Sequence, residues 1–427
     1  MRDDATSGDG RRSRLRADLG LGRDTGLLFW AHLLQGGAFA VQATLWTLFI
    51  RSLGASPQQI GAVVGGAAVA RTILAIPAGV LVDRLTPKPV MLVASALPVI
   101  GTLMLVAASE WWHALAGALV LEMSGIAIPA VSVYIAATTP SHRRTHAYTY
   151  IFTIATQIGL TIMPVVGGLL ADSLGFRAVY TVSAALFAAS IGFFVMLRGT
   201  PRVSQDEDGD DVIRPGYIHL LRSPAVGVVV GFHLLVPLLP FVAIALLPNF
   251  LNEVRDLSYS TIGLLGSVGS AVGLGLSLLV SHWKRLSRPF VSIGLCLGLV
   301  SLSFVLFLSS GAFAAIIIAY MLRSSVGPVW SLMAAAVADV TPERLRGRAF
   351  GLCELGAGVG DIGAPFLSGT LYARDPYLPL WFGLLTTAPL AVSSLVVNRL
   401  RSRLVAIPSV ISGESAVVVE SSESGNM

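Results

Sequence analysis

The sequence predicts an all-α membrane protein of twelve transmembrane helices, arranged as two six-helix halves. Three observations predict this fold class. Hydrophobic residues make up 54% of the 427 residues and charged residues only 12%, apolar runs long enough to cross a bilayer recur along the chain, and one strongly polar stretch divides these runs six and six. Soluble domains carry about 25% charged residues, about twice the share in this chain. Together with the mean hydropathy of +0.76, the low share of charged residues argues against a water-soluble enzyme.

Each apolar run has about 20 residues or more, which is what a helix needs to cross a hydrocarbon layer about 30 Å thick. A helix satisfies its own backbone hydrogen bonds in lipid, and the runs lack the alternation of a transmembrane barrel. The expected spans of the first half are 27–50, 60–82, 89–108, 112–137, 148–170 and 177–197. Those of the second half are 225–250, 260–281, 290–309, 312–337, 349–371 and 377–397.

The distribution of Lys and Arg predicts the orientation of these helices. With the N-terminus in the cytoplasm, the inner segments hold 23 of the 29 Lys and Arg residues and the outer loops hold four. Cytoplasmic loops carry the excess of positive charge, so both termini are expected in the cytoplasm and the protein in the plasma or inner membrane. The expected division is a cytoplasmic tail, a first half, a cytoplasmic linker, a second half and a second cytoplasmic tail, at 1–26, 27–198, 199–223, 224–398 and 399–427.

The two halves repeat weakly in sequence. TPSHRRTHA at 139–147 corresponds to TPERLRGRA at 341–349, and each is followed by a Pro among small residues, MPVVGG at 163–168 and APFLSG at 364–369. Internal repeats of this kind are typical of transporters built from two similar halves. The charged stretch SQDEDGDD at 204–211 lies between them and is expected to be a linker.

One short motif carries a family resemblance. The loop after the second apolar run reads GVLVDRLTPKPV at 79–90. In a chain of twelve expected helices, this stretch resembles the signature Gly-x-Leu-x-Asp-Arg-x-Gly-Arg-Lys of the major facilitator superfamily. It matches at Gly79, Leu81, Asp83, Arg84 and Lys88, and departs where Thr86 and Pro87 replace the Gly-Arg pair. The resemblance covers residues 27 to 398 and implies the fold, but no particular substrate.

The resemblance implies that Asp83 belongs to a cytoplasmic gate. In this family the inner end of helix 2 lies near the inner start of helix 11, which here follows Arg346 and Arg348. A carboxylate is favoured at a helix N-terminus, and Gly79 would let the helices approach closely. We expect Arg84 and Lys88 to face headgroups or a carboxylate. The alternative is that Asp83 and Arg84 are only a solvated helix end.

Five charged residues fall inside the expected spans, where each is costly and needs a reason. Two are cations and three are carboxylates, and they are Arg71, Arg323, Glu122, Glu354 and Asp361. We expect Arg71 to be available to Glu122, and Arg323 to compensate one of the two carboxylates of its own half. A carboxyl removed from water and left over could carry a proton, and depth favours Asp361 over Glu354. The alternative is that all five form static pairs.

Helix 1 carries a polar and aromatic stripe that we expect to line the substrate cavity, because the resemblance places helices 1, 4, 7 and 10 there. Its members are His32, Gln35, Phe39, Gln42 and Trp46. Hydrogen bonding between helices is the alternative. Weaker candidates lie on helices 7 and 10, namely His233 and Trp330.

The stretch GLTIMPVVGG at 159–168 resembles an exporter motif, Gly-x-x-x-Gly-Pro-x-x-Gly-Gly. It matches at Gly159, Pro164, Gly167 and Gly168, with Met163 in place of the middle Gly. The leading hypothesis is therefore a monomeric antiporter that exports small organic molecules in exchange for protons.

Two alternatives remain open, a proton-coupled importer of a sugar or metabolite and a transport-inactive membrane sensor. The sequence has no GxxxxGK[ST] loop and no metal or hydrolase spacing. We expect no enzymatic activity, no cofactor or metal, and no nucleic-acid partner.

Overall fold

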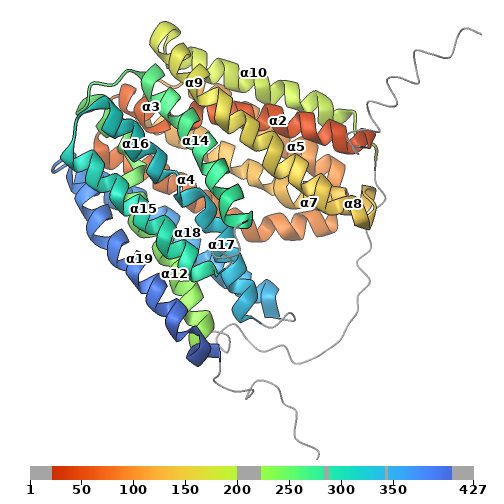
Figure 1. The fold of residues 1–427 in the computed structure, drawn as a ribbon. Coiled ribbons are helices and arrows are strands. Elements are labelled where there is room, and N and C mark those ends of the chain that lie inside the picture. The colour runs from red at the N-terminus through yellow and green to blue at the C-terminus, as the bar shows by residue number, and fades with distance from the viewer. Residues whose placement is uncertain (1–21, 200–222, 283–287, 342–344, 406–427) are drawn as a thin grey trace, which may run out of the picture.

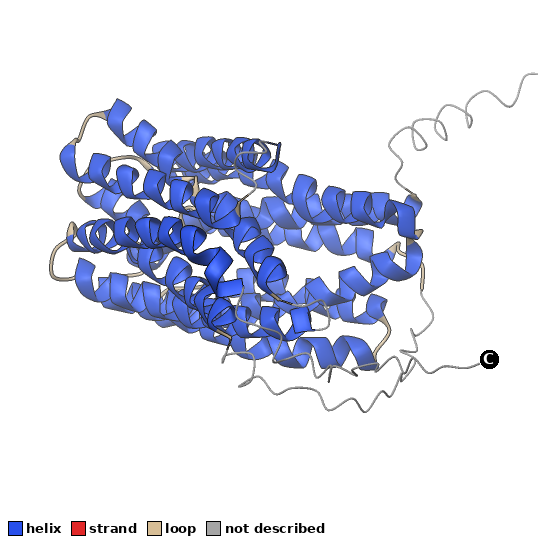
Figure 2. Cartoon of the chain, turned by 60° about the horizontal axis from the view of Figure 1, so that its bottom comes forward, coloured by secondary structure: helices blue, strands red, loops and turns tan. Residues whose placement is uncertain are grey.

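The structure is a computed structural model that describes residues 22–199, 223–282, 288–341 and 345–405, without the side chains of 75–84 and 400–405. The described residues form helices and no strands (Figure 2). The residues before 200 are called the first half and those from 223 onward the second half. The first half comprises α2 (Arg23–Ala43), α3 (Trp46–Ser52), α4 (Pro57–Arg84), α5 (Pro87–Val106), α6 (Trp111–Glu122), the 3₁₀ turn η1 (Met123–Ile126), α7 (Ala127–Thr138), α8 (Ser141–Tyr148), the π-helical η2 (Thr149–Ala155), α9 (Thr156–Leu174) and α10 (Phe176–Val195).

The second half has the corresponding set of helices. It comprises α12 (Pro224–Ala245), α13 (Leu247–Glu253), α14 (Tyr259–His282), α15 (Pro289–Ser309), α16 (Phe313–Arg323), α17 (Val326–Val340), α18 (Arg346–Tyr372) and α19 (Leu378–Val405). Within the described ranges, nine helical stretches are long and apolar enough to cross a membrane, or ten if α2 and α3 count as one span bent by 50°. The more polar α4 and α18 have 28 and 27 residues and are also long enough to cross, so the described elements fit the expected twelve crossings.

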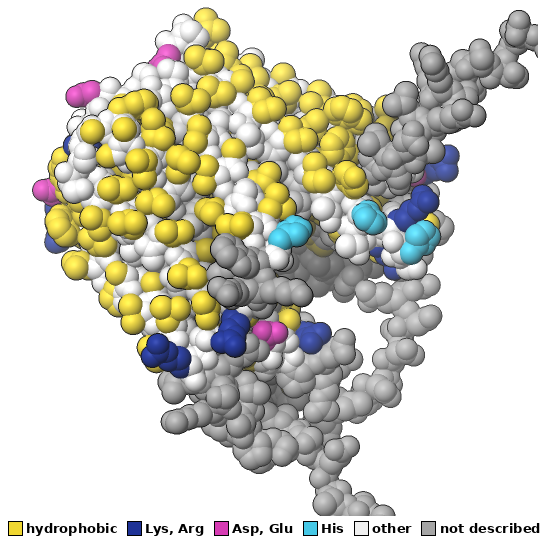
Figure 3. All heavy atoms as spheres, viewed as in Figure 1, with side chains coloured by type: hydrophobic (Ala, Val, Ile, Leu, Met, Phe, Trp, Pro, Cys, Tyr) yellow, Lys and Arg dark blue, Asp and Glu magenta, His cyan; other side chains and the backbone are white. Residues whose placement is uncertain are grey.

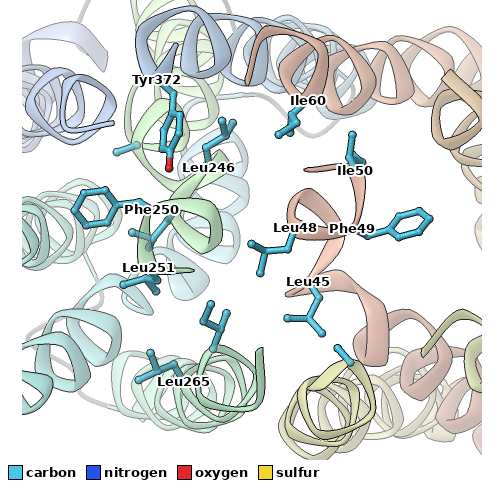
Figure 4. Packing of buried hydrophobic residues seen from close by; sticks show 14 of the residues in the cluster. Leu45, Leu48, Phe49, Ile50, Ile60, Leu246, Phe250, Leu251, Leu265 and Tyr372 are labelled. Carbon is cyan, nitrogen blue, oxygen red and sulfur yellow. The ribbon is translucent and has the colours of Figure 1, made fainter. Parts of the chain in front are cut away.

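The halves meet at one end of the bundle and diverge toward the other (Figure 1). Both halves contribute to the large core cluster at the meeting end, which includes Leu48 and Ile50 on α3 and Phe250 and Leu251 on α13 (Figure 4). We call this the closed end. The clusters around Val337 and Ile135, in contrast, each belong to one half. They lie toward the end where α2 begins and α19 finishes, which we call the terminal end.

Polar contacts reinforce the closed end. Arg51 Nε donates a hydrogen bond to Glu253 Oε1 across the halves at 2.7 Å, and Tyr372 donates its hydroxyl to Glu253 Oε2 at 2.8 Å. The Asp172 carboxylate at the end of α9 accepts the backbone N–H groups of Tyr259 and Ser260, which begin α14. A side chain of one half thus satisfies helix-start donors of the other, which fixes their relative position.

The surface fits a lipid environment. Hydrophobic side chains cover much of the face in Figure 3, while most Lys and Arg side chains in that view lie toward its lower and right-hand edges, near the terminal end. Large apolar residues such as Ile73, Leu174, Val359 and Leu385 are more than half exposed. Such exposure suits contact with lipid tails or with an internal cavity, and would be costly in water.

Candidate functional site

A cavity of about 670 Å³ lies between the two halves and reaches both of them. Its walls combine apolar and aromatic surface with one group of charges, which is the usual character of a small-molecule site. The lining residues that carry the argument are Phe39, Gln42, Trp46, Arg71, Glu122, Phe241, Trp330 and Asp361. The first five come from the first half and the last three from the second.

Arg71 on α4 holds two carboxylates in this cavity. Its Nη2 donates to Asp361 Oδ2 on α18 at 2.9 Å, and its Nη1 lies 3.9 Å from Glu122 Oε2 at the end of α6. The side chains of Arg71, Asp361 and Glu122 are 51%, 28% and 23% exposed, so all three reach the cavity. One guanidinium faces two carboxylates, and the closer pair joins the two halves.

This arrangement corrects the expected pairing of charges. The availability of Arg71 to Glu122 is confirmed by their 3.9 Å approach, but the expected compensation of Asp361 or Glu354 by Arg323 is wrong. Asp361 pairs with Arg71 from the other half. Arg323 forms no ion pair with any described residue and instead stacks on the Tyr320 ring at 4.3 Å. Glu354 is exposed and forms no ion pair within the described ranges.

The stripe on helix 1 divides between the cavity and the interior of the first half. Phe39, Gln42 and Trp46 line the cavity, and Gln42 Nε2 also donates to Ser183 Oγ at 3.1 Å. His32 points elsewhere, because its Nδ1 bonds the Leu28 carbonyl at 3.0 Å and its ring packs edge-on against Phe152 and Phe194. Gln35 is half-buried and is not among the cavity-lining residues.

The candidates on helices 7 and 10 also differ in placement. Trp330 lines the cavity and meets Phe241 edge-on at 6.5 Å between ring centres. His233 is buried, with its Nδ1 against the Val229 carbonyl at 2.9 Å, and it does not line the cavity. Phe241 was missed in the sequence. It lies one residue after Pro240 on helix 7, and a run of apolar residues does not reveal which face meets a cavity.

Helices 1, 4, 7 and 10, which we expect to line the cavity, are each interrupted at about the level of the cavity. Helix 1 breaks between α2 and α3, and helix 7 breaks at Leu246 between α12 and α13. Helix 4 passes into a 3₁₀ turn directly after Glu122, and helix 10 breaks directly after Arg323. Each of the last two breaks therefore places a charged residue at the end of a half-helix, where side chains and backbone face a cavity rather than lipid.

The exporter-like motif of helix 5 lies on α9, at the places where this helix crosses α2 and α14. A Cβ on Gly167 would meet the Val41 carbonyl, and one on Gly159 would lie 2.6 Å from the Gly37 nitrogen, so both allow α9 to approach α2. A Cβ on Gly168 would meet the Tyr259 carbonyl of α14. The motif thus joins helix 5 to its neighbours in both halves.

The same kind of crossing between the halves occurs twice, once between α9 and α14 and once between α18 and α4, which confirms the internal repeat read from the sequence. Gly263 on α14 faces the Pro164 carbonyl just as Gly61 on α4 faces the Pro365 carbonyl. Gly168 and Gly369 approach Tyr259 and Pro57 in the same matched way. Gly61 and Gly263 were not singled out from the sequence, where a glycine inside an apolar run carries no sign of which neighbour it meets.

The expected gate is described only in part. The side chains of Asp83 and Arg84 and the surroundings of Gly79 are not among what the structure describes, so their contact with α18 remains a prediction. Lys88 Nζ donates to the Val195 carbonyl at 3.0 Å and to the Leu197 carbonyl, so it holds the end of α10 within the first half rather than facing headgroups or a carboxylate. Arg346 and Arg348 lie in the first turn of α18 and both interact with other groups.

Comparisons with known proteins agree with this architecture. A family model described as Major Facilitator Superfamily matches residues 28–324 and 241–405. The multidrug resistance protein MdtG of Yersinia enterocolitica is 33% identical over 182 residues, which cover 40% of this chain and 44% of MdtG. The inner membrane transport protein YajR of Escherichia coli is 27% identical over 213 residues, 49% of this chain and 44% of YajR. The alignments thus span less than half of each relative.

Solved structures share the fold at low identity. The nucleoside transporter NupG superimposes with a TM-score of 0.70 at 15% identity, covering 90% of this chain and 99% of NupG. A bacterial homologue of the lysosomal transporter Spinster, in an inward-facing and unoccupied conformation, gives a TM-score of 0.65 at 16% identity, covering 90% and 93%. The family match across the chain and the shared fold lead to one conclusion: this chain belongs to the major facilitator superfamily.

Proposed function

We propose that this protein is a secondary active transporter that exports small organic molecules in exchange for protons. The observation that carries the proposal is the sharing of Arg71 between Glu122 and Asp361 in a cavity between the halves. One guanidinium balances one carboxylate, so the second is left with an uncompensated charge unless it binds a proton. A group that binds and releases a proton beside the substrate is what antiport requires.

The position of Asp361 links that proton to movement of the halves. Its 2.9 Å bond to Arg71 joins α18 to α4, and these helices cross between the halves. A proton on Asp361 removes the charge that attracts Arg71, and Arg71 remains near Glu122 within its own half. Protonation would thus release one of the ties between the halves, whereas a proton on Glu122 would leave that tie in place.

Two features favour export. The helix 5 motif resembles an exporter motif, and the chain is similar over part of its length to a protein named for multidrug resistance. The cavity wall is largely apolar and aromatic, which suits drug-like molecules better than sugars, since a sugar needs many hydrogen-bonding partners. The nucleoside transporter NupG shares the fold alone and does not decide the direction.

We also propose that the terminal end faces the cytoplasm, from the distribution of Lys and Arg. A fluorescent protein that matures only in the cytoplasm should fluoresce when fused after residue 403. Activity of only a periplasm-specific reporter at the same position would contradict this orientation and the expected count of twelve crossings.

The proton hypothesis is tested in proteoliposomes with compounds to which expression of the chain gives resistance. Asp361→Asn should abolish proton movement on addition of substrate and uptake driven by a pH gradient, while substrate binding remains. Glu354→Gln tests the other candidate carboxylate of helix 11, and Asp256→Asn, in an exposed loop, is the control. Coupling that survives Asp361→Asn but is lost in Glu122→Gln would place the carrier on helix 4.

A further inference from the structure

A second, smaller chamber lies beside the main cavity, on the closed-end side of Trp46. It has a volume of about 300 Å³, at the lower end of the range of about 300–1,000 Å³ for ligand pockets. The two spaces share Ala43, Trp46, Val64 and Ala245 as walls. The chamber is further lined by Thr44, Thr47, Ile244, Leu247, Pro248, Tyr320 and Arg323.

Arg323 is the charged residue of this chamber, and it lacks a partner among the described residues. Its Nε is buried without a hydrogen bond, and its guanidinium stacks on the Tyr320 ring at 4.3 Å. Stacking uses the face of the guanidinium and leaves its N–H edge free to donate. The three charges of the main cavity do not line the chamber.

The depth of Arg323 makes this free edge unusual. α16 begins at Phe313 near the closed end and finishes at Arg323, so the residue lies roughly 15 Å along a crossing of about 30 Å. A cation near the middle of a membrane is expensive unless it is paired or faces a water-filled space. Hydrophobic walls on helices 1 and 7 strengthen its attraction for any anion that enters, because they exclude water.

A second unpartnered donor lies in the same chamber. Thr47 Oγ1 is buried without a hydrogen bond, and Thr47 as a whole is 6% exposed. A buried hydroxyl without a partner costs free energy, and a chamber ligand that accepts a hydrogen bond would remove that cost. Thr44 adds a further hydroxyl at the break of helix 1. Arginine and hydroxyl donors without a carboxylate form a set that recognises an anion.

We propose that the chamber around Arg323 and Thr47 is a binding site for a small monovalent anion, either chloride or the carboxylate group of an organic molecule. The anion would accept hydrogen bonds from the Arg323 guanidinium and from the Thr47 hydroxyl. Arg323 belongs to the second half and Thr47 to the first, so a bound anion ties the halves near the closed end. The proposal depends on neither the direction of transport nor its coupling to protons.

The test measures binding without transport. Purified protein in detergent is titrated with sodium chloride or sodium benzoate at constant ionic strength, with the bulky sulfonate HEPES as the balancing anion, and its thermal unfolding midpoint is recorded. An anion that binds the folded state stabilises it by RT ln(1 + [anion]/Kd), so the midpoint rises with the logarithm of the anion concentration, here by about 2–4 °C at the highest concentration used. Arg323→Gln should remove most of this rise. Arg374→Gln, which removes an exposed loop arginine, should keep it.

Two further variants keep the test decisive if Arg323→Gln folds poorly. Thr47→Val retains the charge and should raise the Kd fitted to this rise about tenfold, as expected for the loss of one hydrogen bond to a charged group. Arg323→Lys should keep a weaker response, because a lysine lacks the planar fork. A response to chloride identifies an inorganic ion, and a response to benzoate alone identifies an organic carboxylate. Equal rises in the wild type, Arg323→Gln and Thr47→Val, or no rise in the wild type, would overturn the proposal.

Discussion

Arg71 has the most consequential position of the intramembrane charges, because its two partners lie in different halves. Asp361 is 290 residues away in the sequence, whereas Glu122 is on a neighbouring helix of the same half. Removing one member of a buried ion pair leaves the other without compensation, while removing both can be almost neutral. Half of the Arg71 side chain is exposed, so water in the cavity screens the pair and reduces the cost.

This asymmetry gives a prediction at the residue scale. Arg71→Gln leaves Glu122 and Asp361 facing each other and should lower the stability of the folded protein by about 1–2 kcal/mol. The double variant Arg71→Gln, Asp361→Asn should be more stable than Arg71→Gln alone, since it retains only one carboxylate. Thermal unfolding midpoints of the wild type, Arg71→Gln, Asp361→Asn and the double variant measure this. A double variant whose loss equals the sum of the two single losses would show that the pair is not coupled.

The sequence allowed the positions of these charges to be predicted, but only part of their pairing. Spacing along the chain places Arg71, Glu122 and Asp361 inside apolar runs, and a run of that length must be a helix. Which charges meet depends on the rotation of each helix and on contacts between halves, neither of which periodicity determines. The same limit explains His32: it keeps helical spacing with Gln35 and Phe39, yet it packs against Phe152 and Phe194 away from the cavity.

At the scale of the elements, the crossings between halves depend on glycine beside a proline-containing helix. α14 crosses α9 at Gly263 and Pro164, and α4 crosses α18 at Gly61 and Pro365. The sequence predicted the helices and the repeat of their motifs, because these are local features. It did not predict Gly61 and Gly263 as crossing points, because close approach is a property of two helices together.

Gly263→Ala tests the crossing. The new Cβ would press on the Pro164 carbonyl group and lie 3.2 Å from the Gly168 Cα, and overpacking of this kind costs about 1–3 kcal/mol. Because the clash is with backbone, the halves must separate at the closed end, so the unfolding midpoint should fall. Gly275→Ala on the same helix is the control, since its Cβ would have no neighbour within 4 Å. Equal midpoints for the two variants would contradict the proposed role of this crossing.

At the scale of the whole molecule, the structure is closed at one end, as one of the two states of the proposed alternating-access transporter would be. The closed end is held by a shared apolar core and by the Arg51–Glu253 ion pair, which Tyr372 extends to α18. In the opposite state these contacts must break and others must form at the terminal end. The motif around Asp83 is the sequence feature that could supply them. Contacts at the closed end and contacts at the terminal end would then stabilise two mutually exclusive arrangements of the halves.

Competition between the two ends gives opposite expectations for two charge-neutralising variants. Glu253→Gln removes the ion pair at the closed end, whose partners are 45% and 27% exposed, so the loss should be about 1 kcal/mol. A change of that size shifts a two-state equilibrium about fivefold toward the state open at the closed end. Asp83→Asn should shift it in the other direction and reduce transport at least about tenfold, because it weakens the proposed gate at the terminal end.

Spin labels at position 177, at the exposed start of α10, and at position 374, on the exposed loop after α18, report this equilibrium once the buried Cys296 and Cys353 are replaced. Glu253→Gln should increase the long-distance population, and Asp83→Asn should increase the short-distance population. The double variant should return toward the wild-type distribution, because the two effects oppose each other. Asp256→Asn is a control that removes a carboxylate from the loop that follows Glu253 and retains a side chain that tolerates its positive φ of 53°. If both variants shift the distances in the same direction, the ends do not compete, and Asp83 stabilises the fold instead of a gate.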